Sequence, residues 1–216
     1  MSIATPVPAK VWTELEDFET AALEAIDSDD ALEAVRITGL TLENADLLRL
    51  NLRQAVFEGC RFSGCDLRRW DLVDVTFLSC ELSNCDMTDS YLSRVRFQGV
   101  KALGLRLSQA VLRDVAFADC DLRYANLAGS KAKALGFSGC ELTEASLARC
   151  ELRQASFDKC TLTRADLFQT SLKGIDLRTC QIGEVLLSES MTELKGATVD
   201  LIQAADLARR LGILIG

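Results

Sequence analysis

The sequence of 216 residues contains no histidine. Without histidine it can build neither a Ser-His-Asp triad, nor a Cys-His pair, nor a His-ligated zinc site, so the commonest routes to hydrolytic chemistry are closed. It also lacks any stretch approaching the roughly 18 consecutive apolar residues that a membrane helix requires. Its first residues, MSIATPVPAK, have neither the basic region nor the apolar core of an export signal. We therefore expect a cytoplasmic protein that makes no membrane contact.

The number of cysteines is odd. The sequence has nine of them and no export signal, which argues against a secreted disulfide framework and favours free thiols. Their spacings are all multiples of five and match no zinc-site pattern. We expect no metal and no cofactor, and we interpret the cysteines as small, buried, inert packing residues. A metal or redox role is the alternative.

A period of five residues runs through most of the chain. Every fifth residue from Ile37 to Leu187, 31 positions in all, is Leu, Phe, Ile, Met or Ala. Two residues earlier in each unit the side chain is small or aliphatic, apart from two serines, one threonine and Trp70, and all nine cysteines fall here. This period fits neither the 3.6 residues of a helix turn nor the alternation of a long strand. Each unit must therefore turn a corner and point one pair of side chains inward.

A second, longer period, equal to four units of the first, is superimposed on it. Phenylalanine occupies every twentieth position from Phe57 to Phe157, and six cysteines recur in the same way on another side. Like residues in every fourth unit predict coils of four units, which means an all-β solenoid with four sides. Eight glycines share the position two residues after the large apolar one, where a tight corner favours a positive φ.

The units ADLLR (45–49), CDLRY (120–124) and ADLFQ (165–169) resemble the pentapeptide-repeat family, whose consensus is A(D/N)LXX. The resemblance covers residues 35–189 and implies a right-handed quadrilateral β-helix, with the handedness taken from the family. Trp70 departs from the small residue of the consensus, and we expect a local bulge or an outward-turned ring there. Well-studied members bind DNA gyrase and topoisomerase IV and protect them from quinolones by imitating DNA.

The charge pattern bears on this imitation. Residues 35–189 hold equal numbers of acidic and basic residues, whereas a mimic of duplex DNA should have a clearly negative face. One acidic patch is expected because three of its aspartates recur with the longer period and so stack on one side. The alternative is that these side chains form hydrogen bonds within their own turns. The candidate partner-binding residues are Asp46, Asp66, Asp71, Asp74, Glu81, Asp86 and Asp89.

A basic column also repeats in multiples of the longer period. Basic side chains in such a column could contact phosphates, but acidic residues are interspersed and the sequence has only two tyrosines. We interpret the column as a solvated face and expect no direct binding of nucleic acid. Its residues are Arg53, Arg113, Lys133, Arg153 and Lys173.

The two ends of the array need caps, because an uncovered coil exposes its core and its backbone edge. Within an acidic segment, 1–34, residues 11–26 predict an amphipathic helix with a capping box of Thr13 and Glu16. We interpret this helix as the N-terminal cap, with partner binding as the alternative.

Within residues 190–216, a second helix is predicted over 200–211, started by Asp200 and stopped by Gly212. The apolar side chains here exceed what one cap requires, so we expect a homodimer joined at this end. The alternative is a cap folded back on its own coil. The expected dimer residues are Leu201, Ile202, Leu207, Leu211, Ile213, Leu214 and Ile215.

The leading hypothesis is a non-enzymatic protein that interacts with DNA gyrase or topoisomerase IV by DNA mimicry and protects from quinolones. The alternative is a structural scaffold whose protein partner is not a topoisomerase. A convex rod implies no concave pocket, and exposed carboxylates outside a pocket rarely have tuned pKa values. We therefore expect no small-molecule substrate and no catalysis.

Overall fold

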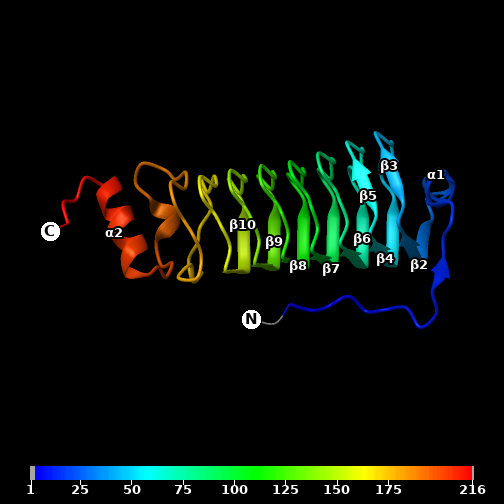
Figure 1. The fold of residues 1–216 in the computed structure, drawn as a ribbon, viewed down its shortest axis with the longest axis horizontal. Coiled ribbons are helices and arrows are strands. Elements are labelled where there is room, and N and C mark those ends of the chain that lie inside the picture. Colours follow the sequence, from blue (N-terminus) through cyan, green and yellow to red (C-terminus); the bar gives the residue numbers. More distant parts are fainter. Residues whose placement is uncertain (1–2, 216) are drawn as a thin grey trace.

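The protein winds into a rod of stacked four-sided coils with a helix at each end (Figure 1). A computed structural model describes residues 3–215. Residues 1–2 and 216, the outer ends of the two expected terminal segments, lie outside this range. The expected all-β solenoid with helical caps is confirmed. No helix within residues 3–215 has the length and apolar character needed to cross a membrane.

The elements follow one another along the rod in chain order. They are β1 (Thr13–Glu14), α1 (Phe18–Ser28), β2 (Ala31–Thr38), β3 (Thr41–Glu43), β4 (Asn51–Glu58), β5 (Arg61–Ser63), β6 (Asp71–Leu78), β7 (Tyr91–Gln98), β8 (Val111–Ala118), β9 (Lys131–Ser138), β10 (Glu151–Asp158), the 3₁₀ helix η1 (Thr192–Leu194) and α2 (Leu201–Arg210).

The strands pair in parallel with a constant offset of one coil. One sheet has the order β1-β2-β4-β6-β7-β8-β9-β10, and β3 pairs with β5. From β2 to β10 each residue pairs with the equivalent residue of the next coil, as Phe57 does with Phe77. The remaining sides are joined by short bridges such as Asp66 to Asp86 and Glu81 to Lys101. The predicted coil of four five-residue units is therefore the observed one.

The phenylalanines of the longer period form a continuous stack inside the rod. Ring centroids of neighbours from Phe57 to Phe157 are 4.5 to 5.2 Å apart, and neighbouring planes differ by at most 12°. Free aromatic pairs prefer offset or edge-on contact. Here the ladder spacing of about 4.8 Å between coils imposes the parallel arrangement.

Some of the small inward residues are hydrogen-bond donors. On different sides of the rod, their polar atoms donate to a carbonyl oxygen of the preceding coil: Cys60 Sγ donates to Ile37 at 3.4 Å, and Ser90 Oγ donates to Leu67 at 3.5 Å. All nine cysteines are buried and free, as predicted. Burial raises the pKa of the Cys85 thiol to about 12, so this thiol stays protonated at neutral pH.

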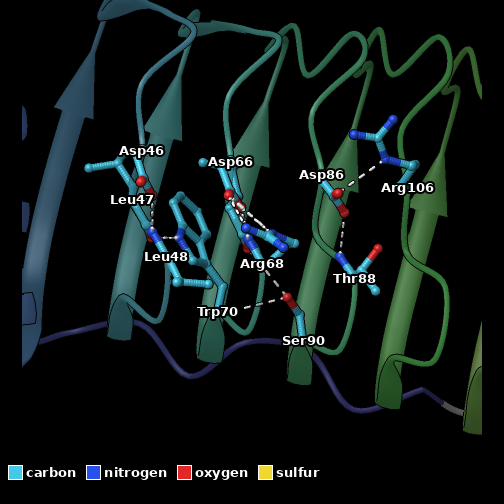
Figure 2. A network of polar contacts seen from close by, with 11 residues as sticks. Asp46, Leu47, Leu48, Asp66, Arg68, Trp70, Asp86, Thr88, Ser90 and Arg106 are labelled. Atoms are coloured by element: carbon cyan, nitrogen blue, oxygen red, sulfur yellow. Dashed lines mark hydrogen bonds and ion pairs between the residues drawn. The ribbon is translucent and has the colours of Figure 1, made fainter.

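Trp70 lies inside the rod, which corrects the expectation of a bulge or an outward ring. Its side chain is 0% exposed, and its Nε1–H donates to the carbonyl oxygen of Leu47 at 2.7 Å (Figure 2). The next residue in its column is the small Ser90, whose hydroxyl accepts from the Trp70 backbone N–H at 3.0 Å. The indole thus makes the same bond to the preceding coil that a cysteine or serine makes elsewhere, and the column is not interrupted.

The corners of the coils have the predicted backbone conformation. The eight glycines that share the corner position all have positive φ, for example +63° at Gly139. Non-glycine residues occupy the same position at other corners, with a φ of 56° at Gln154. This conformation costs a non-glycine residue about 1–2 kcal/mol, and the ladder hydrogen bonds on both sides of the corner hold it in place.

The N-terminal helix begins later than predicted. Asp17 is its N-cap and accepts from the Thr20 backbone N–H, so the expected capping box of Thr13 and Glu16 is wrong. The reason is that Thr13 and Glu14 form β1, which pairs with the exposed edge of β2. The helix packs against the first coils through Phe18, which is 0% exposed and contacts the Phe57 ring edge-on with centroids 5.4 Å apart.

The C-terminal helix begins and ends as predicted. Asp200 is the N-cap, and Gln203 completes a capping box with it. The Gln203 amide also donates to the carbonyl oxygens of Leu177 and Cys180 at 2.8 and 2.7 Å, which fixes α2 against the last coil. Gly212 follows the helix with a φ of 79°.

Replacing Trp70 with alanine should destabilise the protein by about 3–5 kcal/mol, because it leaves a large cavity and an unpaired carbonyl at Leu47. Guanidinium unfolding followed by circular dichroism measures the loss. The other tryptophan, Trp12, is only half-buried, so Trp12→Ala serves as the control and should cost clearly less. A Trp70→Ala protein within about 1 kcal/mol of the wild type would contradict the buried, hydrogen-bonded indole.

Candidate partner-binding surfaces

Three of the predicted acidic residues form a ladder on one side of the rod. Asp46 bridges to Asp66, and Asp66 bridges to Asp86, so the three side chains stack from coil to coil (Figure 2). Each carboxylate accepts the backbone N–H of the residue two positions on: Leu48 at 3.3 Å, Arg68 at 3.1 Å and Thr88 at 3.0 Å. The predicted stacking is present, and so are the turn hydrogen bonds that are its alternative explanation.

Arginines pair with two members of this ladder. Arg68 Nη2 lies 2.5 Å from Asp66, and Arg106 Nε lies 3.2 Å from Asp86. The hydrogen bond from Arg68 lowers the pKa of Asp66. Burial alone would raise the pKa of Asp86, but hydrogen bonds from Thr88 and the nearby Arg106 outweigh it, and the net pKa is lowered. Both carboxylates are therefore charged at neutral pH and locally neutralised.

The other four predicted residues lie elsewhere on the rod. Asp71 and Asp74 are on β6, where they pair with Arg53 at 2.8 Å and Arg94 at 2.6 Å. Glu81 lies on the side of β3 and β5 and pairs with Arg61 at 3.1 Å. Asp89 occupies the corner that follows the ladder, with a φ of 61°. The seven residues thus occupy more than one side, and only Asp89 adjoins the aspartate ladder.

The aspartate side is mixed in charge. Arg49, Arg69 and Arg106 share this side with the three aspartates, and Arg68 projects across Asp66. Among residues 3–215, Asp46 and Asp89 have no ion-pair partner, and both are exposed. Asp166, several coils further along the same side, has no ion-pair partner in that range either. The negative potential on this side is therefore local to separated carboxylates rather than continuous along the rod.

Part of the basic column forms a cationic groove. Arg113, Lys133 and Arg153 are in register on β8, β9 and β10, and they line a hollow of about 560 Å³. Lys131 is also in this hollow and lies 3.8 Å from Glu151. Arg53, at the other end of the column, forms an ion pair with Asp71. The groove can accept an anionic group, but interspersed carboxylates weaken its charge, as expected from the sequence.

The C-terminal end is the most apolar part of the surface. Leu214 is 97% exposed, Leu201 86% and Ile202 75%. Of the other predicted dimer residues, Leu211, Ile213 and Ile215 are exposed, and Leu207 packs partly against the core. A groove of about 820 Å³ lies between α2 and the last coil, with Ile182, Ile202 and Leu207 in its lining.

The structure gives no indication of a metal centre in its described part. Within residues 3–215, no group of three or more Cys, Asp or Glu side chains is placed to hold a metal ion. Surface carboxylates are instead paired with arginines or with backbone N–H groups. Binding surfaces on the outside of the rod are therefore the candidate sites.

Four-sided coils of five-residue units, with the candidate surfaces on their convex outside, define a β-solenoid. The chain belongs to the pentapeptide-repeat family: a model of a pentapeptide repeat region matches residues 70–147, and a model of eight pentapeptide repeats matches residues 36–72 and 137–178. Among curated protein sequences, none matches the chain significantly.

The chain is similar to solved structures, one of which shows the same fold with a TM-score above 0.5. A trypsin-treated variant of QnrB1, a plasmid-mediated fluoroquinolone resistance protein, aligns with a TM-score of 0.54 and 25% identity over 84% of this chain and 90% of that one. HetL, a pentapeptide repeat protein involved in regulating heterocyst differentiation in the cyanobacterium Nostoc sp. strain PCC 7120, aligns with a TM-score of 0.38 and 20% identity over 81% of this chain and 94% of that one.

In several turns an aspartate pairs with an arginine two positions later, as Asp176 does with Arg178, and this pairing predicts a pH dependence of stability. The hydrogen bond from Arg178 lowers the pKa of Asp176 to about 2. Because this pKa lies below the value of about 4 in the unfolded chain, the stabilisation is present above about pH 4 and is lost as the pH falls through 2. In a carboxyl ¹³C NMR titration, Arg178→Gln should raise the Asp176 midpoint toward its ordinary value. Arg123→Gln, which breaks the equivalent Asp121 turn, should not; an Asp176 midpoint unaffected by Arg178→Gln would contradict the pairing.

Proposed function

We propose that this protein is a non-enzymatic, cytoplasmic protein that binds DNA gyrase or topoisomerase IV and protects it from quinolones. The observation that supports this best is the likeness to QnrB1, which extends over 90% of that chain at 25% identity with a TM-score of 0.54. A likeness of this extent covers most of both chains, so it is more than the sharing of a few repeats.

The charges on the rod shape how such binding would work. An ion pair with its members in contact produces little field beyond the Debye length of about 8–10 Å in physiological salt. The paired carboxylates Asp66, Asp74 and Asp86 therefore offer a weak long-range field. Imitation of DNA by this chain would rest on the shape of the rod, with Asp46 and Asp89 as local anionic contacts.

We also propose a homodimer joined through the C-terminal ends. Apolar side chains gathered on one surface, such as Ile202 and Leu214, mark an interaction site in a soluble protein. A two-fold axis through this end would bring each exposed tail, 213–215, toward the groove beside α2 of the partner. Gln203 and Leu207 already cap the last coil, so the exposed residues are not needed for the cap itself.

One observation favours a different partner. Acidic and basic residues are equal in number over residues 35–189, and the two signs are interleaved as ion pairs on several sides. A scaffold that recognises a protein with a mixed surface would need no continuous negative face. We keep this scaffold role as the second candidate function.

The first test is a gyrase supercoiling assay with the purified protein. We expect inhibition at micromolar concentration and protection from quinolone-induced cleavage. Asp46→Asn with Asp89→Asn removes the two exposed carboxylates that lie beside the aspartate ladder without an ion pair, and should weaken inhibition by about tenfold, the effect of losing roughly 1.4 kcal/mol of contact energy. Asp166→Asn alters the same column several coils away and is the control. Absence of both inhibition and protection would remove the topoisomerase proposal and leave the scaffold role.

The second test is the mass in solution. Size exclusion with light scattering should give twice the 23.6 kDa of one chain. Ile202→Asp with Leu214→Asp should give the single-chain mass, because burying two added carboxylates in an apolar interface is costly. Leu23→Asp, at an exposed apolar residue of α1, is the matched control and should remain dimeric. A wild-type protein that stays monomeric at high concentration would contradict the dimer.

A further inference from the structure

Residues 3–12, here called the strap, run along the outside of the rod past the ends of several strands before entering β1 (Figure 1). Every third residue of the strap, namely Ile3, Pro6, Ala9 and Trp12, is half-buried, and the residues between them are exposed. A period of three residues is that of a polyproline II helix, and Pro6 and Pro8 favour this conformation. The strap therefore turns one edge toward the rod along its whole length.

Two aspartates hold the backbone of the strap. The N–H of Ala4 donates to Asp114 at 3.0 Å, and the N–H of Val7 donates to Asp74 at 2.9 Å. Gln54 at the same corner of an earlier coil donates its side-chain amide to the Val7 carbonyl oxygen at 3.4 Å. Each anchoring group recognises main-chain atoms of the strap, so these contacts select a backbone conformation rather than particular side chains.

The spacing of the anchors matches the spacing of the strap. Asp74 and Asp114 occupy equivalent corners that are two coils apart. Two coils span about 9.6 Å at the ladder spacing, and three residues of polyproline II span about 9.3 Å. Donors three residues apart in such a chain therefore meet carboxylates two coils apart without distortion of either.

The surface under the strap is shaped for close approach. A Cβ atom added at Gly136 would lie 2.4 Å from Cδ1 of Ile3, so any other residue here would require the Ile3 side chain to move. Ile3 and Pro6 also line a small cavity of about 150 Å³ together with Ala116. Small side chains lie where an inward-facing strap residue arrives, and larger ones would lift the strap off the rod.

Asp74 is held by Arg94 as well as by the strap. Both of its carboxylate oxygens accept from Arg94, at 2.6 and 2.7 Å, which fixes their direction. With the strap in place Asp74 is only 9% exposed, and its Oδ1 also accepts from the Val7 N–H. The sequence singles out Asp74 as part of an acidic patch, but the structure places it in a site for main-chain N–H groups.

We propose that the docking strip formed by Asp74, Asp114, Ala116 and Gly136 is a binding site for an extended, proline-containing polypeptide with an apolar residue at every third position, and that the strap is its resident occupant. A partner segment of this chemistry binds by exchange with the strap. Because the strap is tethered, its effective concentration is in the millimolar range, and exchange is favoured only when the partner is also held elsewhere on the rod.

The first arm of the test releases the strap in the full chain. Ala4→Pro with Val7→Pro removes the two N–H donors and keeps a φ suited to polyproline II. Trypsin can cleave after Lys10, the single basic residue in residues 1–34. Cleavage should be at least about tenfold faster in this double variant than in the wild type, as expected for losing two hydrogen bonds. Thr5→Pro adds a proline without removing either bond and is the control; equal cleavage of all three proteins overturns the docking.

The second arm tests binding in trans. A fluorescent peptide of residues 3–12 is titrated against the wild type and the double variant, and its anisotropy is measured. The released strip should bind the peptide at least about tenfold more tightly than the occupied one, and the gain should disappear when Asp74→Asn is added to the double variant. A peptide with proline at positions 4 and 7 should not bind. Equal affinity for both proteins, no binding to either, or binding of the proline-substituted peptide would overturn the proposal.

Discussion

The spacing between coils, about 4.8 Å along the rod, is the constraint on which the rest of this structure depends. Each residue meets the equivalent residue of the next coil at this distance, so whatever one coil places at a position must tolerate a similar side chain directly beside it. Phenylalanine rings respond by lying parallel. Small inward residues respond by donating to a carbonyl of the preceding coil, and Trp70 does the same with its indole. Some charged side chains respond by alternating in sign, as Asp74 and Arg94 do, whereas the stacked Asp66 and Asp86 are each neutralised by an arginine.

This constraint also explains how much could be predicted. The fold follows from two periods alone, because no helix or open sheet tolerates a strict five-residue phase over 31 units. Trp70 was misplaced because the family pattern describes side-chain size, whereas the interior here accommodates an indole whose N–H reaches a carbonyl oxygen of the preceding coil. The start of α1 was misplaced because the capping-box signal is local, while the edge of β2 needed a pairing partner from residues 13–14.

The candidate sites were predicted less well than the fold, for a related reason. The stacking of Asp46, Asp66 and Asp86 is a matter of period and was found. Ion pairing depends on arginine at the next coil, or two positions on in the same turn, and both signals were present: Arg106 follows Asp86 one coil later, and Arg68 shares a turn with Asp66. Reading the acidic residues without these partners overstated the patch. Glu193, which is buried and accepts from Gln169 and Ser188, lies outside the repeat and carried no periodic signal.

A surface built on a fixed repeat distance can also select the conformation of an extended chain that binds to it. Two coils match three residues of polyproline II, and the strap contacts the rod at that spacing through Asp114 and Asp74. A strand would span a similar distance of about 9.9 Å over three residues, but its period of two points groups three residues apart to opposite sides, so only one of the two N–H groups could face the rod. The fixed repeat distance therefore favours an extended partner with a period of three residues. A solenoid with balanced charges can in this way distinguish partners by their backbone geometry. A strongly charged solenoid would distinguish them by its electrostatic potential.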